Sequence, residues 1–151
     1  MLKQLQIKNY ALIDELDIEF SNNLSVITGE TGAGKSILLG ALGLILGKRA
    51  DVQTLQNKEN KCIIEGFFQI GEYQLNSFFD ANDLDYEIET TLRREISPSG
   101  KSRAFINDTP VNLGQLKEIG SYLIDVHSQH EALLLNSTSF KFSVIESFAG
   151  H

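Results

Sequence analysis

Residues 29–36, GETGAGKS, combine residue types and a spacing that suit phosphate chemistry. The pattern Gly-x-x-x-x-Gly-Lys-Ser is that of a phosphate-binding loop, in which glycines let the backbone curl so that successive N–H groups point at a phosphate. A helix that starts near Lys35 would add the positive end of its dipole to these donors. The motif therefore predicts that the chain binds the phosphates of a nucleotide.

The two residues that close the motif have distinct predicted roles. Lys35 supplies a mobile positive charge for the β and γ phosphates, and the Ser36 hydroxyl is placed to coordinate Mg²⁺. The expected ligand is ATP together with Mg²⁺. The residues expected to contact it are Gly29, Glu30, Thr31, Gly32, Ala33, Gly34, Lys35, Ser36 and Ile37.

The alternative interpretation of the motif is a glycine-rich turn with an incidental lysine. A short, mostly apolar strand at 24–28 precedes the motif, and a helix follows it from Ser36 to about Lys48. Apolar residues cover nearly the whole surface of that helix, which predicts burial on most sides. Because a phosphate-binding loop requires this strand and this helix, the context favours nucleotide binding.

The rest of the chain alternates strand and helix patterns, as a mixed α/β domain does. Strands are predicted at 2–7 and 12–20, joined near Asn9 and Tyr10, and further strands at 61–70 and 86–96. The apolar face of the strand at 86–96 is expected to carry Ile88, Leu92 and Ile96.

The second half of the chain continues this pattern. A turn at 97–101 is expected to form a hairpin with a strand at 102–106. Asn112 is expected to cap a short helix, residues 121–126 to form a buried strand, and Ser137 to cap a last helix. No motif places residues 57–85.

Length and composition limit the classes of protein. A chain of 151 residues is one ordinary domain, and its formal net charge of -7 would repel a phosphate backbone, so any contact with nucleic acid needs a local basic patch. Its one cysteine, Cys62, suits a reducing compartment. The N-terminus has no signal-peptide pattern, and the longest apolar stretch, 37–46, is too short to span a bilayer. We expect a soluble cytoplasmic protein.

Several stretches in order along the chain resemble one family. They are NYALIDELDIEFSNNLSVITGETGAGKSILLGALGLILGKRAD, then SRAFINDTPV, LIDVHSQHE and ESFAG. They resemble the amino-terminal half of the ATPase head of RecN, a family of bacterial DNA-repair proteins similar to SMC proteins, whose heads are of the ABC class. The sequence departs from the family at Ser128, where a glycine is more usual. The resemblance implies an α/β lobe of a P-loop NTPase, with a mixed sheet and an antiparallel β subdomain.

The resemblance also implies a role for Gln129. In ABC-type heads a glutamine in this loop reaches Mg²⁺ and helps to order the attacking water, so Lys35 and Gln129 are the expected catalytic residues, and Ser36 and Gln129 the expected metal ligands. The order His127-x-x-His130-Glu131 is not that of a zinc protease motif, and we reject zinc. The acids of residues 80–87 lack the glycine and spacing of a calcium loop.

Two groups of basic residues have competing interpretations. Lys48 and Arg49 end the predicted helix, where cations suit the helix dipole, although an arginine near here can approach nucleotide or DNA in SMC-like heads. A cluster within 93–103 could face DNA, but its neighbours Glu87, Glu89 and Glu95 favour cross-strand charge pairing; its members are Arg93, Arg94, Lys101 and Arg103.

Tyr10 is also open to two interpretations. It could stack on adenine, as aromatic residues do in some ABC proteins, or pack on the sheet at a turn.

Two motifs of a complete ABC head are missing from the sequence, which indicates that this chain is one lobe of a larger protein. After Gln129 there is no ABC signature sequence and no apolar strand that ends in Asp-Glu. In RecN-like and SMC-like proteins that second half returns after a coiled coil, whose root would be residues 137–151 of the lobe that spans 1–151. The resemblance then implies recombinational repair of double-strand breaks, in the bacterial cytoplasm and at the nucleoid.

The expected partners are ATP, the carboxyl-terminal lobe of the same head, a second head in a homodimer, and DNA through other regions, with no membrane. The alternatives are the same lobe of another ABC-class ATPase, either an SMC-like chromosome protein or a transporter subunit, and a nucleotide-gated dimerisation module.

Overall fold

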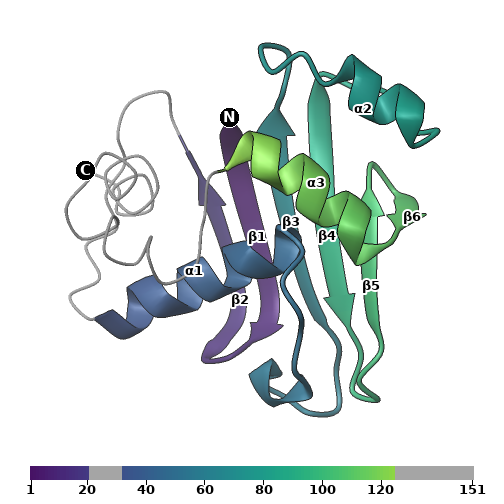
Figure 1. Ribbon diagram of the computed structural model, residues 1–151. Coiled ribbons are helices and arrows are strands. Elements are labelled where there is room, and N and C mark those ends of the chain that lie inside the picture. Colours follow the sequence, from purple (N-terminus) through teal and green to yellow (C-terminus); the bar gives the residue numbers. More distant parts are fainter. Residues whose placement is uncertain (21–31, 125–151) are drawn as a thin grey trace.

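The computed structural model describes residues 1–20 and 32–124, and the strand expected at 24–28 and the helix expected after Ser137 lie outside them. The elements, in chain order (Figure 1), are β1 Leu2–Tyr10, β2 Ile13–Glu19, α1 Gly32–Ile45, the 3₁₀-helix η1 Val52–Thr54, β3 Cys62–Gln69, α2 Asn76–Ala81, β4 Glu89–Ile96, β5 Ser102–Ile106, β6 Thr109–Val111 and α3 Leu113–Leu123.

The strands form one six-stranded sheet in the order β2-β1-β3-β4-β5-β6, and the described pairings are all antiparallel. β1 lies in the interior of the sheet, where Leu5 is the register partner of Ile18 on β2 and of Gly66 on β3. Because side chains alternate between the faces of a strand, this register places all the buried positions of β3 and β4 on one face. Helices α1 and α3 cover that face (Figure 1).

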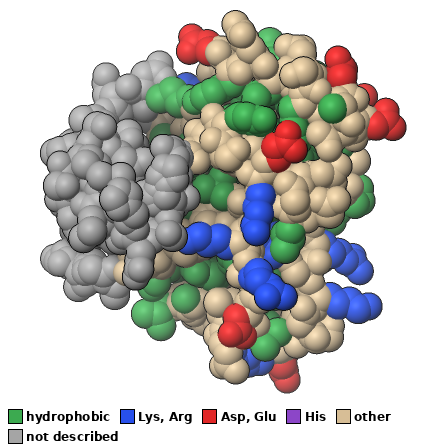
Figure 2. Space-filling view, in the orientation of Figure 1, with side chains coloured by type: hydrophobic (Ala, Val, Ile, Leu, Met, Phe, Trp, Pro, Cys, Tyr) green, Lys and Arg blue, Asp and Glu red, His purple; other side chains and the backbone are tan. Residues whose placement is uncertain are grey.

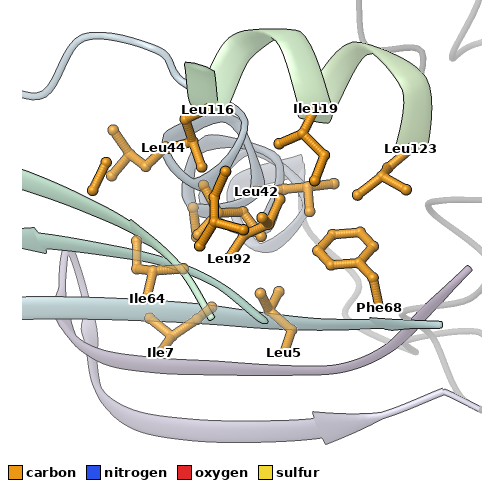
Figure 3. Close-up of a cluster of buried hydrophobic side chains, with 14 of the residues drawn as sticks. Leu5, Ile7, Leu42, Leu44, Ile64, Phe68, Leu92, Leu116, Ile119 and Leu123 are labelled. Carbon is orange, nitrogen blue, oxygen red and sulfur yellow. The ribbon is translucent and has the colours of Figure 1, made fainter. Parts of the chain in front are cut away.

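The core lies between the sheet and these two helices (Figure 3). Burying this apolar surface supplies most of the driving force for folding, at about 25 cal/mol per Å² removed from water. Side chains from the sheet and from both helices meet there. Those drawn and labelled are Leu5, Ile7, Ile64, Phe68 and Leu92 of the sheet, Leu42 and Leu44 of α1, and Leu116, Ile119 and Leu123 of α3.

Glycines let α1 approach its neighbours closely. A Cβ atom on Gly66 of β3 would lie 2.5 Å from Cδ1 of Ile45 in α1, and one on Gly120 of α3 would lie 2.9 Å from Cδ2 of Leu46, just past the end of α1. A Cβ on Gly40 of α1 would collide with the hydroxyl of Tyr10 on β1. The position of α1 between β1, β3 and α3 therefore depends on residues without side chains.

Most predicted strands and the predicted cap are confirmed. The strands expected at 2–7, 12–20, 61–70 and 102–106 correspond to β1, β2, β3 and β5. Asn112 caps α3 in a capping box. Its Oδ1 accepts from the Gln115 backbone N–H at 2.8 Å, and Gln115 Oε1 accepts from the Asn112 backbone N–H at 2.9 Å.

Three expectations about element boundaries are wrong. The strand expected from residue 121 is not formed at 121–123, because Leu116, Ile119 and Leu123 continue one apolar helix face, and α3 runs to Leu123. Ile88 precedes β4 and is 55% exposed, so the apolar face of that strand holds Leu92 and Ile96 only. The helix expected to run to about Lys48 ends at Ile45.

The sequence analysis also missed α2. This short helix lies within residues 57–85 and buries Phe78 and Phe79, which pack edge to face with ring centroids 5.5 Å apart. It has only six residues, too few for a helical apolar period to stand out. Among the described helices none is long and apolar enough to cross a membrane.

We predict that Gly66→Ala destabilises the fold by about 1–3 kcal/mol, because the new methyl group overpacks the contact between β3 and α1. The free energy of unfolding, measured by urea titration, checks this. Gly71→Ala is the matched control, since a Cβ there would have Ile88 Cγ2 at an ordinary 3.6 Å. Equal stabilities of the two variants would contradict the close approach of α1 to the sheet.

Candidate nucleotide-binding site

Helix α1 begins inside the phosphate-loop motif. Its first residue is Gly32, so residues 32–36, GAGKS, form its first turn and the following residue. The first N–H groups of a helix have no partner within the helix, and they stand at the positive end of its dipole. Since this first turn also contains no acidic residue, the start of α1 is suited to an anion. The helix expected after the motif is confirmed.

The predicted contacts of the individual motif residues stay predictions. Gly29, Glu30 and Thr31 lie outside the described residues, and for residues 32–35 only the backbone is described. Ser36 is exposed, and Ile37 is partly buried against the core. An exposed hydroxyl at the start of the helix is an oxygen ligand of the kind that Mg²⁺ takes, so the described part of the motif fits Mg-ATP.

Gln129, the other predicted catalytic residue, lies outside the described residues, as do Asp125, His127, His130 and Glu131. Within residues 1–20 and 32–124 no group of three or more His, Cys, Asp or Glu side chains could hold a metal ion, and the acids of 80–87 form no such group.

The opposite end of α1 is bound by a buried arginine of the sheet. Arg94 of β4 is 0% exposed, and its Nη1 donates to the backbone oxygens of Leu44 at 2.6 Å and Lys48 at 2.7 Å. Its Nε and Nη2 donate to Ser102 Oγ on β5, at 2.9 and 2.7 Å. One guanidinium therefore joins the β4–β5 hairpin to the end of α1.

This position corrects two expectations. Arg94 belongs neither to a DNA-facing patch nor to surface charge pairs, because it lies between Leu92 and Ile96 on the buried face of β4. Lys48 and Arg49 lie beyond Ile45, where α1 ends, and both are exposed. The cation hydrogen-bonded at the C-terminal end of the helix is Arg94.

Two backbone carbonyl groups and the Ser102 hydroxyl accept hydrogen bonds from Arg94 in place of a carboxylate. The described salt bridges do not include Arg94. Burial lowers its pKa, an effect that Cys62 opposes. Burial also raises the pKa of the Cys62 thiol to about 12, against the influence of Arg94, so this thiol is neutral at pH 7. The carbonyl groups at the negative end of α1 therefore compensate the buried charge.

Arg93, on the other face of β4, makes the charge pairs that the sequence indicates. Its guanidinium lies 3.2 Å from Glu95, 3.1 Å from Asp108 and 3.8 Å from Glu65, and it covers the ring of Phe105 at 4.2 Å from the centroid. Charge pairing is thereby confirmed for Arg93: the pair with Glu65 of β3 crosses strands, and the pair with Glu95 lies along β4.

The remaining two basic residues of the cluster lie at the tip of the β4–β5 hairpin. Lys101 and Arg103 line a surface cleft of about 280 Å³. Lys61, which pairs with Glu95 at 3.3 Å, lines the same cleft, together with Ser97 and Ser99.

The helix-covered face carries a second basic area. Figure 2 shows Lys and Arg side chains over the middle of this face, with Asp and Glu side chains nearer its upper and lower edges. Lys48 and Lys117 line a cleft of about 240 Å³ where the end of α1 meets α3.

Tyr10 packs on α1. It is 8% exposed, and its hydroxyl lies against Gly40. Burial raises its pKa, with a smaller contribution from Cys62. A ring buried in this way has no face for an adenine base, so the interpretation of Tyr10 as a packing residue is the correct one.

Sequence analysis missed two polar residues that organise this region. Arg94 could have been found from its position, since a charged residue between two buried ones on a strand must find a partner in the core. Asn9 is buried at the end of β1, donates to the backbone oxygens of Asn57 and Asn60, and accepts from the Asn57 N–H. No sequence pattern predicts these contacts across the fold.

Comparison with known proteins defines the class. A family model described as an AAA domain matches residues 4–145. Among solved structures, the SMC head bound to the C-winged helix domain of ScpA matches with a TM-score of 0.63 at 18% identity, over 80% of this chain and 40% of that one. RecF with ATP matches with a TM-score of 0.63 at 17% identity, over 89% of this chain and 33% of that one. The chain belongs to the AAA-domain family and has the fold of the amino-terminal lobe of an SMC-type head.

Its relatives within this class are RecN proteins. The DNA repair protein RecN of Haemophilus influenzae is 42% identical over 155 residues, and RecN of Bacillus subtilis is 38% identical over 152 residues. These alignments cover 100% and 99% of this chain, and 28% and 26% of those proteins. The resemblance to RecN is confirmed, and the chain spans about a quarter of the length of these relatives.

We predict that the free energy of unfolding falls as pH rises from about 9 towards 12. The ordinary pKa of the thiol is 9.0, and the folded state raises it to about 12, so Cys62 contributes stability below pH 9 that is lost as pH rises through this window. The slope is about 1.4 kcal/mol per pH unit for one group. Urea titrations between pH 8 and 9.5 measure it, below the ordinary pKa of 10.0 at which Tyr10 and Tyr73, whose pKa values burial also raises, add to the same trend.

Cys62→Ala is the comparison for this prediction. Because alanine does not ionise, the variant should lose little stability over the same pH range, even if it is less stable at pH 8. Parallel pH curves for the two proteins would exclude Cys62 as the cause.

Proposed function

We propose that this chain is the Mg-ATP-binding lobe of a RecN-like ATPase that acts in recombinational repair of DNA double-strand breaks. The observation that carries the proposal is the start of α1 inside GETGAGKS, on a lobe with the SMC-head fold. The sequence similarity to RecN extends over the same residues and the rest of the chain.

Different residues would bind different parts of the nucleotide and its metal ion. The glycines of residues 29–34 and the free N–H groups of the first turn of α1 cradle the β and γ phosphates. Lys35 neutralises their charge, Ser36 and Gln129 ligate Mg²⁺, and Gln129 orients the attacking water. Mg²⁺ supplies further neutralisation of the charge that develops on the phosphates. Lys35 and Gln129 are thus the proposed catalytic residues.

Hydrolysis in this proposal needs more than this lobe. The chain spans 28% of the H. influenzae relative, and the carboxyl-terminal lobe of the same head and a second head of a homodimer are proposed to complete the site. Support comes from a solved structure that belongs to work on ATP-driven dimerisation and DNA-stimulated activation of SMC ATPases. It matches with a TM-score of 0.63 at 16% identity over 95% of this chain.

The remaining parts of the proposal rest on the RecN relatives. Residues 137–151 would be the root of the coiled-coil arm that leads to the second half. DNA would be bound mainly by other regions, in the bacterial cytoplasm and at the nucleoid. Arg49, exposed just beyond α1, stays a candidate for contact with nucleotide or DNA.

We predict that Lys35→Ala removes most Mg-ATP binding and leaves the free energy of unfolding nearly unchanged, because it deletes the main positive charge of the site from a loop-to-helix junction. Calorimetric titration of the folded variant measures the affinity. Lys8→Ala, at an exposed position of β1, makes the same change of charge and should bind as the parent does. Unchanged affinity of Lys35→Ala would overturn the proposed function.

We predict that the 151-residue chain alone turns over no ATP and that adding a separately produced carboxyl-terminal half of a RecN relative restores turnover. The isolated lobe lacks the groups proposed to complete the site, and one preorganised donor is typically worth about 10² to 10³ in rate. Phosphate release over a range of chain concentrations checks this. Steady turnover by the chain alone, abolished by Lys35→Ala, would show that the lobe already contains the catalytic groups.

A further inference from the structure

The contacts of Arg94 join two parts of the fold that are distant in sequence. The backbone oxygen of Leu44 in the last turn of α1, that of Lys48 just past the helix, and one hydroxyl of β5 accept hydrogen bonds of 2.6 to 2.9 Å from one guanidinium group. A planar fork with fixed donor directions can make these bonds only when α1 has one position and one rotation relative to the sheet. The contact therefore constrains the helix more narrowly than apolar packing does.

An arginine is a costly residue at this position. A buried charge loses its hydration, and Arg94 has no carboxylate partner among the described salt bridges to offset that loss. Its neighbours on the same face of β4, Leu92 and Ile96, are apolar and fully buried. An apolar residue would fill the space without this cost, so the arginine supplies geometry that an apolar side chain lacks.

The other described contacts of α1 limit it in a different way. At Gly66 and Gly40 the backbone of one element packs directly against a side chain of the other, and such van der Waals contacts lack the fixed direction of a hydrogen bond. The described hydrogen bonds that reach the end of α1 from the sheet come from Arg94. Because a helix of 14 residues is a rigid rod of about 21 Å, a shift at its C-terminal end reaches its first turn.

We propose that Arg94 is a positioning residue for the nucleotide site. By holding the C-terminal end of α1 against the β4–β5 hairpin, it sets where the first turn of α1 presents its N–H groups, Lys35 and Ser36. This proposal rests on the proposed function for its ligand, whereas the constraint on α1 is independent of any ligand.

The experiment compares variants of two adjacent arginines on opposite faces of β4. Arg94→Met keeps the volume and removes the hydrogen bonds, Arg94→Lys keeps the charge without the fork, and Ser102→Ala removes the hydroxyl that orients the guanidinium. Arg93→Met is the matched control, because it breaks surface ion pairs on the same strand and does not touch α1.

Two measurements are made on each variant, well below its unfolding midpoint so that only folded chain is present. The first is the dissociation constant for Mg-ATP by calorimetry. The second is amide hydrogen exchange of the first turns of α1 without nucleotide, compared with exchange in β1 and β3.

We expect Arg94→Met to raise the dissociation constant about tenfold, which corresponds to about 1.4 kcal/mol. Arg94→Lys and Ser102→Ala should give smaller increases in the same direction, and Arg93→Met none. Exchange should accelerate in the first turns of α1 and stay unchanged in β1 and β3.

Other outcomes overturn the proposal. Folded Arg94 variants that bind Mg-ATP as the parent does, or exchange that rises equally in every element, would mean that Arg94 only stabilises the fold. If Arg94→Met does not fold, Arg94→Lys and Ser102→Ala decide in the same way. If the parent chain itself does not bind Mg-ATP, the proposed function fails, and the exchange pattern still decides the role of Arg94.

Discussion

The burial of α1 against one face of the antiparallel sheet is the constraint on which the rest of the structure depends. The helix is apolar on most sides, and its buried residues Leu38, Ala41, Leu42, Leu44 and Ile45 contact the core. The helix can lie this close to β3 and α3 because Gly66 and Gly120 have no side chains, which would push it away. The last residues of the phosphate-loop motif are the first residues of this helix, so the packing of the whole lobe determines where the first turn of α1 lies.

The two faces of β4 show how one strand serves both the core and the surface. Arg93 and Arg94 are adjacent in sequence and have identical side chains, yet one covers Phe105 among carboxylates and the other is fully buried at the end of α1. Alternation along the strand explains the difference. A surface ion pair such as that of Arg93 is worth at most about 1 kcal/mol, whereas removing a partner from a buried charged group costs about 3–5 kcal/mol. The stability of the lobe is therefore more sensitive to loss of a partner of Arg94, such as the Ser102 hydroxyl, than to loss of a partner of Arg93.

Local patterns were sufficient for the parts of the fold that local physics decides. Strand patterns predicted β1 to β3, Asn112 as an expected cap marked the start of α3, and the glycines and lysine of residues 29–36 marked the start of α1 within a few residues. The patterns failed where the partner is distant in sequence. Leu123 fits an apolar strand as well as a helix face, and only its packing with Leu116 and Ile119 beside α1 decides between them. The role of Arg94 depends on carbonyl groups about fifty residues away, which no window of sequence contains.

An anion suits the N-terminal end of α1 and a cation suits its C-terminal end. This difference bears on how the helix is held before a nucleotide binds. The positive end of the dipole faces the proposed phosphates, and the negative end meets Arg94, which is part of the fold. Such contacts contribute about 0.3–1 kcal/mol each, and up to about 2 kcal/mol when partly buried. Because the arginine occupies its end permanently, the helix keeps its position in the absence of an anion at the other end. Under the proposal for Arg94, the helix end of the nucleotide site is formed in advance, and ordering the helix takes less of the binding free energy.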